Sequence, residues 1–289
     1  MRHCLLLVLF SLCGTLVSSH AAPVVFTIDS SQSQIKLAGI VAGQTVVEQG
    51  PGSLISRYTG TINVEITGST IQFTGGSVID ALTNGVWQPN VGGGSGSAPA
   101  DFSGRASAGF ITIRGAFRNI VLDVTSALLP LTSGTFNAAA LTFAFPTNST
   151  AAMDYDATLT KGSEQLTGIS TNKVTNAGTL TTVGNTQRIV VQVDTEYFFD
   201  ALSQNDSSAR LTGQLVATRE SGLVIASSAL LNNKLVIAID DTSASLQIQS
   251  TTDFTGWSIR AAAKQVAGGR TTFTVDPPTG AIEFFRALK

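Results

Sequence analysis

The chain has 289 residues, only 12% of them charged, and a formal net charge of −2. This length is sufficient to bury a large core and is typical of one or two domains. The charged residues show no basic cluster, so the sequence argues against nucleic acid as a partner.

The first segment, residues 1–21, has the three regions of a secretory signal peptide. Arg2 gives a basic start, residues 5–12 are almost wholly apolar, and Ser19 and Ala21 are the small residues of a cleavage site. The apolar run is shorter than the roughly 20 residues that a membrane span needs, and no later segment is suited to span a membrane. We therefore expect a secreted protein, extracellular or at the cell surface, without a transmembrane span after cleavage.

Cleavage at this site removes every cysteine and histidine of the chain, namely Cys4, Cys13, His3 and His20. It leaves 16 basic and 19 acidic residues, a net charge of −3. A Ser-His-Asp triad, a cysteine nucleophile and a typical zinc site all need residue types that the mature chain lacks. We therefore expect no cofactor and regard most enzyme classes as excluded.

Alternation of apolar and polar residues with period 2 dominates the remaining sequence and predicts β-strands. Residues 61–66 form the clearest strand, and Gly68-Ser69 predicts a hairpin that joins it to residues 70–73. Further strands are predicted over residues 26–28, 34–37, 110–113, 120–124, 188–199 and 210–217, with a turn around Gly115. No long stretch has the helical period with caps. The predicted fold class is all-β, with an antiparallel β-sandwich or barrel-like main domain and a small C-terminal β-sandwich module.

The domain organisation follows from breaks in this pattern. Residues 1–21 are the signal peptide, residues 22–220 the main domain and residues 223–289 the C-terminal module. A Gly/Ser/Pro-rich run over residues 91–100 is predicted to be a long loop inside the main domain, because strands continue on both sides of it.

The C-terminal module resembles a small β module that often ends exported bacterial surface proteins. The matching residues are Leu246-Gln247-Ile248-Gln249-Ser250-Thr251-Thr252-Asp253, then Trp257, then Glu283-Phe284-Phe285-Arg286. The resemblance implies a fibronectin type III-like sandwich without catalytic activity. We expect Trp257 in its core.

The main domain resembles the anchorless part of proteins that carry a PEP-CTERM sorting tail. The resemblance lies in Phe26-Thr27-Ile28-Asp29, Tyr58-Thr59-Gly60-Thr61-Ile62 and Leu211-Thr212-Gly213-Gln214. After Arg219 the chain has no Pro-Glu-Pro, spanning helix or basic end, so it departs from that family where the tail would begin. The first strand is also similar to that of polyisoprenoid-binding lipocalin-like proteins. Together these resemblances imply an exported, β-rich bacterial surface protein.

Asp194 and Glu196 are the best catalytic candidates. They lie on one face of the predicted strand over residues 188–199, about 6.6 Å apart at the usual strand rise. This separation is within the approximate range of glycosidase carboxylates. A solvated strand face carries the same residue types, so the pair also fits an ordinary outer surface. Phe198 on this face predicts that the face is partly covered.

Trp87, which precedes the glycine-rich run, is the candidate ligand-binding residue. An aromatic side chain on a loop can stack on a sugar, or it can cover one end of a β core. For metal binding, clustered loop carboxylates make Asp154, Asp156, Asp240 and Asp241 weak calcium candidates, although none has the spacing of a full calcium loop.

The sequence thus predicts a non-catalytic exported protein with a structural or adhesive role at the bacterial surface or in the extracellular matrix. Its expected partners are surface polysaccharide or other envelope proteins. Two alternatives remain: a carbohydrate-binding protein that uses Trp87 and the adjacent glycine-rich loop, and a glycosidase that uses Asp194 and Glu196.

Overall fold

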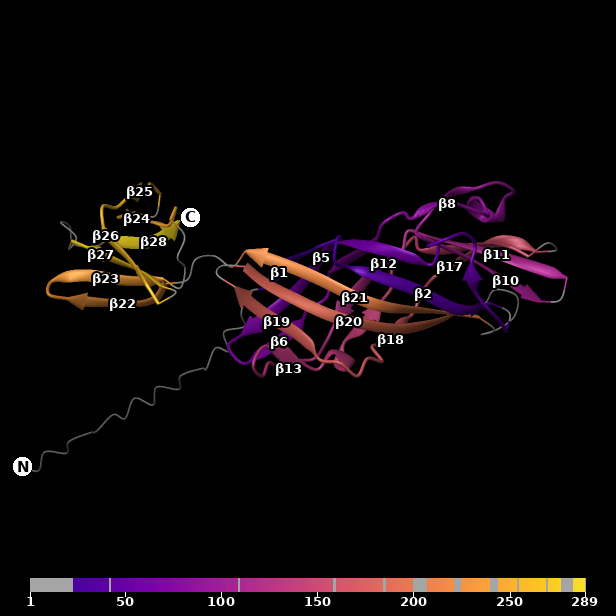
Figure 1. Ribbon diagram of the computed structural model, residues 1–289, viewed down its shortest axis with the longest axis horizontal. Helices are drawn as coiled ribbons and strands as arrows, with labels where there is room; N and C mark the ends of the chain where they lie inside the picture. Colours follow the sequence, from indigo (N-terminus) through magenta and orange to yellow (C-terminus); the bar gives the residue numbers. More distant parts are fainter. Residues whose placement is uncertain are drawn as a thin grey trace, which may run out of the picture.

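The computed structural model describes residues 23–41, 43–108, 110–157, 160–183, 186–199, 207–220, 225–239, 244–253, 255–268, 270–276 and 283–288. In these ranges the chain consists of antiparallel strands and two short 3-10 helices, which confirms the predicted all-β class. The predicted signal peptide lies outside the described residues. Figure 1 shows the strands gathered into a larger and a smaller group, with the C-terminal strands in the smaller one.

Fourteen strands form one large sheet. They are β1 (Val24–Ile28), β2 (Gln34–Val41), β3 (Gln44–Thr45), β5 (Ile55–Thr67), β6 (Thr70–Phe73), β7 (Val78–Ala81), β12 (Val121–Thr125), β13 (Leu129–Pro130), β14 (Thr135–Phe136), β15 (Thr142–Ala144), β18 (Ile169–Thr171), β19 (Gly178–Val183), β20 (Thr186–Phe199) and β21 (Ser207–Glu220). The predicted hairpin at Gly68-Ser69 is confirmed, because Thr67 of β5 pairs with Thr70 of β6.

The large sheet curls into a closed barrel. Strands β1 and β2 lie end to end and together fill one strand position between β5 and β21. The sheet continues through β20 on one side and through β7, β12, β15 and β18 on the other. The two sides meet where the backbone N–H of Lys173, just after β18, donates to the carbonyl oxygen of Asp194 in β20 at 2.8 Å. A second connection is the bridge between Thr132, two residues after β13, and Thr135 of β14.

Strand alternation fills the barrel interior with side chains. In β20, Ile189, Val191 and Val193 are buried, whereas the residues between them face outward and are partly exposed. Large buried side chains come from across the sheet, including Phe26, Tyr58, Phe73, Phe143 and Tyr197. A cavity beside Tyr197 and Phe145 has about 10 Å³ of free space, which is room for about one water molecule.

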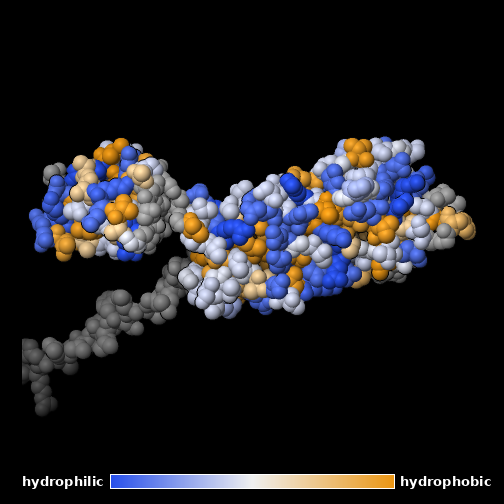
Figure 2. Space-filling view, in the orientation of Figure 1, coloured by the Kyte–Doolittle hydropathy of each residue, from blue (hydrophilic) through white to orange (hydrophobic). Residues whose placement is uncertain are grey.

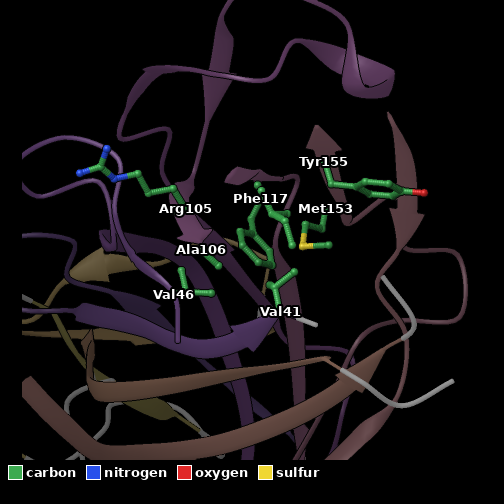
Figure 3. A pocket seen from close by; sticks show the side chains of 10 residues that line it. Val41, Val46, Arg105, Ala106, Phe117, Met153 and Tyr155 are labelled. Atoms are coloured by element: carbon green, nitrogen blue, oxygen red, sulfur yellow. The ribbon is translucent and has the colours of Figure 1, made fainter. Parts of the chain in front are cut away.

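A second, five-stranded sheet packs against one end of the barrel. Its order is β17 (Lys161–Gln165), β16 (Ala152–Asp156), β11 (Ile111–Arg118), β10 (Phe102–Ala108) and β4 (Val47–Glu48). Its inner face shares the barrel's hydrophobic core through residues such as Phe117 and Met153. Figure 3 shows these two side chains near Val41 and Val46. The predicted turn at Gly115 is wrong, because Gly115 lies inside β11 and pairs with Gly104 of β10.

The glycine-rich run forms part of a ribbon that lies over this second sheet. The ribbon consists of β8 (Gly85–Trp87), the 3-10 helix η1 (Val91–Gly93) and β9 (Ala98–Ala100). The close approach of η1 requires glycine, because a Cβ at Gly93 would lie 2.5 Å from the backbone nitrogen of Gly162 in β17. The second 3-10 helix, η2 (Ala138–Ala140), precedes β15.

The C-terminal strands form two small sheets that share a separate hydrophobic core. One sheet contains β22 (Ile225–Leu231), β23 (Lys234–Ile239), β27 (Arg270–Val275) and β26 (Ala263–Ala267), and the other contains β25 (Ser258–Ile259), β24 (Gln247–Thr251) and β28 (Phe284–Leu288). Ile237, Ile248 and Phe273 are among the residues of this core. The expectation that Trp257 belongs to the core is wrong: its ring is partly exposed, with the Arg286 guanidinium 4.3 Å from its centroid.

Candidate functional site

The carboxylates of Asp194 and Glu196 project from the outside of the barrel, each into an ion pair. Both oxygens of Asp194 accept from Arg210, from Nε and from Nη2, at 2.7 Å each. Glu196 Oε2 accepts from Lys173 Nζ at 2.8 Å. These hydrogen bonds favour the charged forms and hold the pKa values of Asp194 and Glu196 below their usual values. The pair is therefore two ionised carboxylates on a convex strand face.

The backbone beneath this pair closes the barrel. Asn172 Oδ1 accepts from the Asp194 N–H at 2.8 Å, and Asn172 Nδ2 donates to the Gln192 carbonyl oxygen at the same distance. Ser170 Oγ accepts from the Glu196 N–H at 3.0 Å. We call this set of side-chain bonds the barrel seam. The cover predicted from Phe198 is absent among the described residues, because its side chain is 61% exposed.

Trp87 is half-buried rather than displayed. Its ring lies so close to Gly50 and Gly85 that a Cβ at either glycine would come within 2.8 Å of a ring atom. The Gln49 side chain holds the neighbouring segment, because it accepts from the Gln88 N–H and donates to the Gln88 carbonyl oxygen, both at 2.9 Å. These contacts match those of an aromatic cover over the chain around Gly50.

Asp154 belongs to a buried ion pair that anchors the ribbon. Its Oδ2 pairs with Arg118 Nη1, and its Oδ1 accepts from the Gly92 N–H at 2.8 Å. Arg118 also donates to the carbonyl oxygens of Pro89 and Pro99, at 2.7 and 2.9 Å. Since both of its oxygens are occupied in this way, Asp154 has a structural role: it holds the ribbon against β16. Arg118 has no recognisable motif in the sequence, so it was not a candidate.

The remaining calcium candidates do not come together as a site. Asp156 pairs with Lys161 Nζ at 3.0 Å, and Asp240 and Asp241 lie outside the described residues. Among the residues that the structure describes, no group of three or more His, Cys, Asp or Glu side chains is arranged to hold a metal ion.

A polar groove on the outer face of β2, β21 and β20 was not foreseen. Cross-strand pairing aligns Gln34, Gln214 and Gln192 in one row, with Lys36, Thr212 and Asp194 in the next. The groove has a volume of about 510 Å³ and is lined mainly by amide and hydroxyl side chains. Gln192 Nε2 donates to Gln214 Oε1 at 3.3 Å, so part of the row is already hydrogen-bonded. The only sequence signal was a glutamine at an outward position of each of the three strands.

Comparison with protein-family models, with curated proteins and with solved structures gave no significant match. No helix in the described ranges has the length and apolar character that crossing a membrane requires.

Proposed function

We propose that this chain is a non-catalytic exported protein with a structural or adhesive role at the bacterial cell surface or in the extracellular matrix. The observation that carries the proposal is the ion pairing of Asp194 and Glu196, the best catalytic candidates in the sequence. A glycosidase needs one carboxyl with a raised pKa to act as the general acid. Here both pKa values are lowered, so neither group retains a proton to donate near neutral pH. Export is supported by the signal-peptide pattern of residues 1–21.

The test compares the full chain with Glu196→Gln on a panel of aryl glycosides and polysaccharides, together with adhesion to isolated cell envelopes. We expect hydrolysis at the buffer rate for both proteins and measurable adhesion for both. Turnover by the wild type that disappears in Glu196→Gln would instead select the glycosidase alternative.

Polysaccharide is our second candidate, as the ligand of an adhesive protein, and the polar groove favours it. Amide side chains both donate to and accept from sugar hydroxyls, and a row of three amides across adjacent strands gives a chain of sugars repeated contacts. On a glycan array we expect Gln192→Ala/Gln214→Ala to lose the signal and Trp87→Ala to keep it. The reverse result would instead favour the alternative from the sequence analysis, in which the carbohydrate binds at Trp87.

A further inference from the structure

The hairpin of β10 and β11 carries two arginines directly opposite each other. Arg105 pairs with Arg114 in the strand register, so both side chains lie on the same outer face of the second sheet, and both are exposed. In Figure 3, Arg105 extends away from the apolar side chains on the inner face. Like charges at directly opposite positions destabilise a sheet. The pair therefore opposes the folding of the hairpin that displays it.

The neighbouring strands compensate the charge of this pair only in part. The same transverse row continues with Val47 on one side and with Asp156 and Lys161 on the other. Asp156 is the acid of the row, and it forms its ion pair with Lys161. Within the described part of the chain, no carboxylate forms an ion pair with Arg105 or Arg114. The row thus contains three cations and one anion, so its net charge of +2 favours an anionic partner.

The end of the same hairpin is apolar. Phe110, at the hairpin end just before β11, is 98% exposed, and Val47, beside Arg105, is 50% exposed. Figure 1 places the ends of β10 and β11 at the extremity of the larger group of strands. Arg114 lies four positions after Phe110, which at the usual strand rise is about 13 Å along the backbone. We call Val47, Arg105, Phe110 and Arg114 the hairpin surface.

We propose that the hairpin surface binds an anionic lipid membrane, with Phe110 inserted at the boundary between headgroups and acyl chains. An apolar side chain that enters this boundary sits about 5–10 Å deep. The backbone of the two arginines lies about 13 Å behind the tip, and their long side chains then reach the level of the lipid phosphates. An acidic polysaccharide would match the arginines but would leave Phe110 in water. The exposed aromatic tip is therefore the observation that favours lipid.

Vesicle sedimentation tests the proposal on the full-length mature chain. We expect binding to vesicles of equal parts phosphatidylglycerol and phosphatidylcholine and none to pure phosphatidylcholine. Each arginine near an anionic surface contributes about fivefold to partitioning, so Arg105→Gln/Arg114→Gln should weaken binding about 30-fold. Phe110→Ser should weaken it at least about tenfold, because an apolar side chain no longer leaves water.

Two matched controls separate the hairpin from general effects of charge and exposed apolar area. Arg57→Gln/Lys234→Gln removes the same charge from the surfaces of β5 and β23, and Phe198→Ser removes another exposed phenylalanine. Both variants should bind as the wild type does. Absence of binding to the anionic vesicles would overturn the proposal, as would equal losses in the control variants. Soluble polygalacturonate is added at the same charge concentration as the vesicles. If it displaces the protein from the vesicles, and if Phe110→Ser binds the vesicles as well as the wild type does, the proposal is overturned in favour of an acidic polysaccharide.

Discussion

At the scale of single residues, the barrel and its second sheet bury two carboxyl groups in different environments, one beside a cation and one largely uncompensated. Arg118 and Asp154 stabilise each other in a buried ion pair. Asp101 is almost equally buried, but the charge of Arg118 only partly offsets the effects of desolvation and of the nearby Asp80 on its carboxyl. Burial raises the pKa of Asp101 to about 6. Its carboxyl is therefore a group whose protonation stabilises the fold.

The raised pKa of Asp101 makes the free energy of unfolding depend on pH. Between pH 4 and pH 6 the folded chain holds a proton on Asp101 that the unfolded chain has released, so the free energy of unfolding falls as the pH rises through this window. We expect Asp101→Asn to remove this loss, which amounts to about 2 kcal/mol between pH 4 and pH 7. Urea denaturation at a series of pH values measures it.

Asp29→Asn is the control with the opposite sign. Hydrogen bonds from Ser31 and Gln32 lower the pKa of Asp29, so its stabilising contribution is present above the usual carboxyl pKa and is lost as the pH falls. If wild type and Asp101→Asn showed parallel pH profiles, Asp101 would not be the group responsible.

At the scale of secondary-structure elements, the barrel seam is the feature with the clearest energetic role. The Asn172 side chain is buried and makes three hydrogen bonds, to the backbone of Ala138, Gln192 and Asp194. Asn172→Ala leaves these backbone groups without their partner, and each buried unsatisfied group costs about 1–3 kcal/mol. Allowing for water entry, we expect a loss of about 3 kcal/mol in the free energy of unfolding, measured by urea titration.

Asn176→Ala is the matched control, because Asn176 is exposed after the same strand. A surface change of this kind is expected to shift stability by less than about 0.5 kcal/mol. Equal midpoints for the two variants would show that the seam does not hold the barrel closed.

Alternation predicted the strands well where one face is buried, as in β5, β20 and β21, which extend a few residues beyond their predicted bounds. It could not predict the seam, because Ser170 lies on a strand only three residues long, Asn172 comes directly after that strand, and both act through their side chains. It also placed Phe110 in a strand, since a phenylalanine before Ile111 and Ile113 continues the apolar pattern. Only the pairing of β10 with β11 shows that this residue lies at the hairpin end.

For the candidate site, alternation predicts which residues share a strand face but not which residues they contact. The shared face of Asp194 and Glu196 follows from period 2, and the structure confirms it. Their partners do not follow from it, because Arg210 is set by the register of β20 with β21 and Lys173 by the closure of the barrel. Whether two carboxylates form a reactive pair or two ion pairs is decided by those long-range contacts.

At the scale of the whole molecule, the described residues bury two separate hydrophobic clusters, one in the barrel with its second sheet and one in the C-terminal strands. No strand pairing among the described residues joins the two. On the face shown in Figure 2, the surfaces of both groups mix hydrophilic and hydrophobic residues. Two cores without a shared sheet are expected to unfold as separate cooperative units.

Calorimetry with two conservative core substitutions tests this independence. Ile248→Val in the C-terminal core should lower the Tm of one transition by about 5 °C, because the loss of one buried methyl group costs about 1 kcal/mol. Ile62→Val in the barrel core should lower only the other transition, and by less, because the larger unit has a greater unfolding entropy. A single transition that moves with both substitutions would show that the cores unfold together.

The anchoring of the ribbon by Arg118 has a practical consequence. One guanidinium holds the carbonyl oxygens of Pro89 and Pro99, so the two ends of the intervening segment are fixed to the same point of the scaffold. Between them, Gly96 faces open space, with no neighbouring atom where a Cβ would be. A loop clamped at its base and unconstrained at its tip is a natural graft point. An epitope or fluorophore inserted at Gly96 would report where the protein resides without disturbing the barrel.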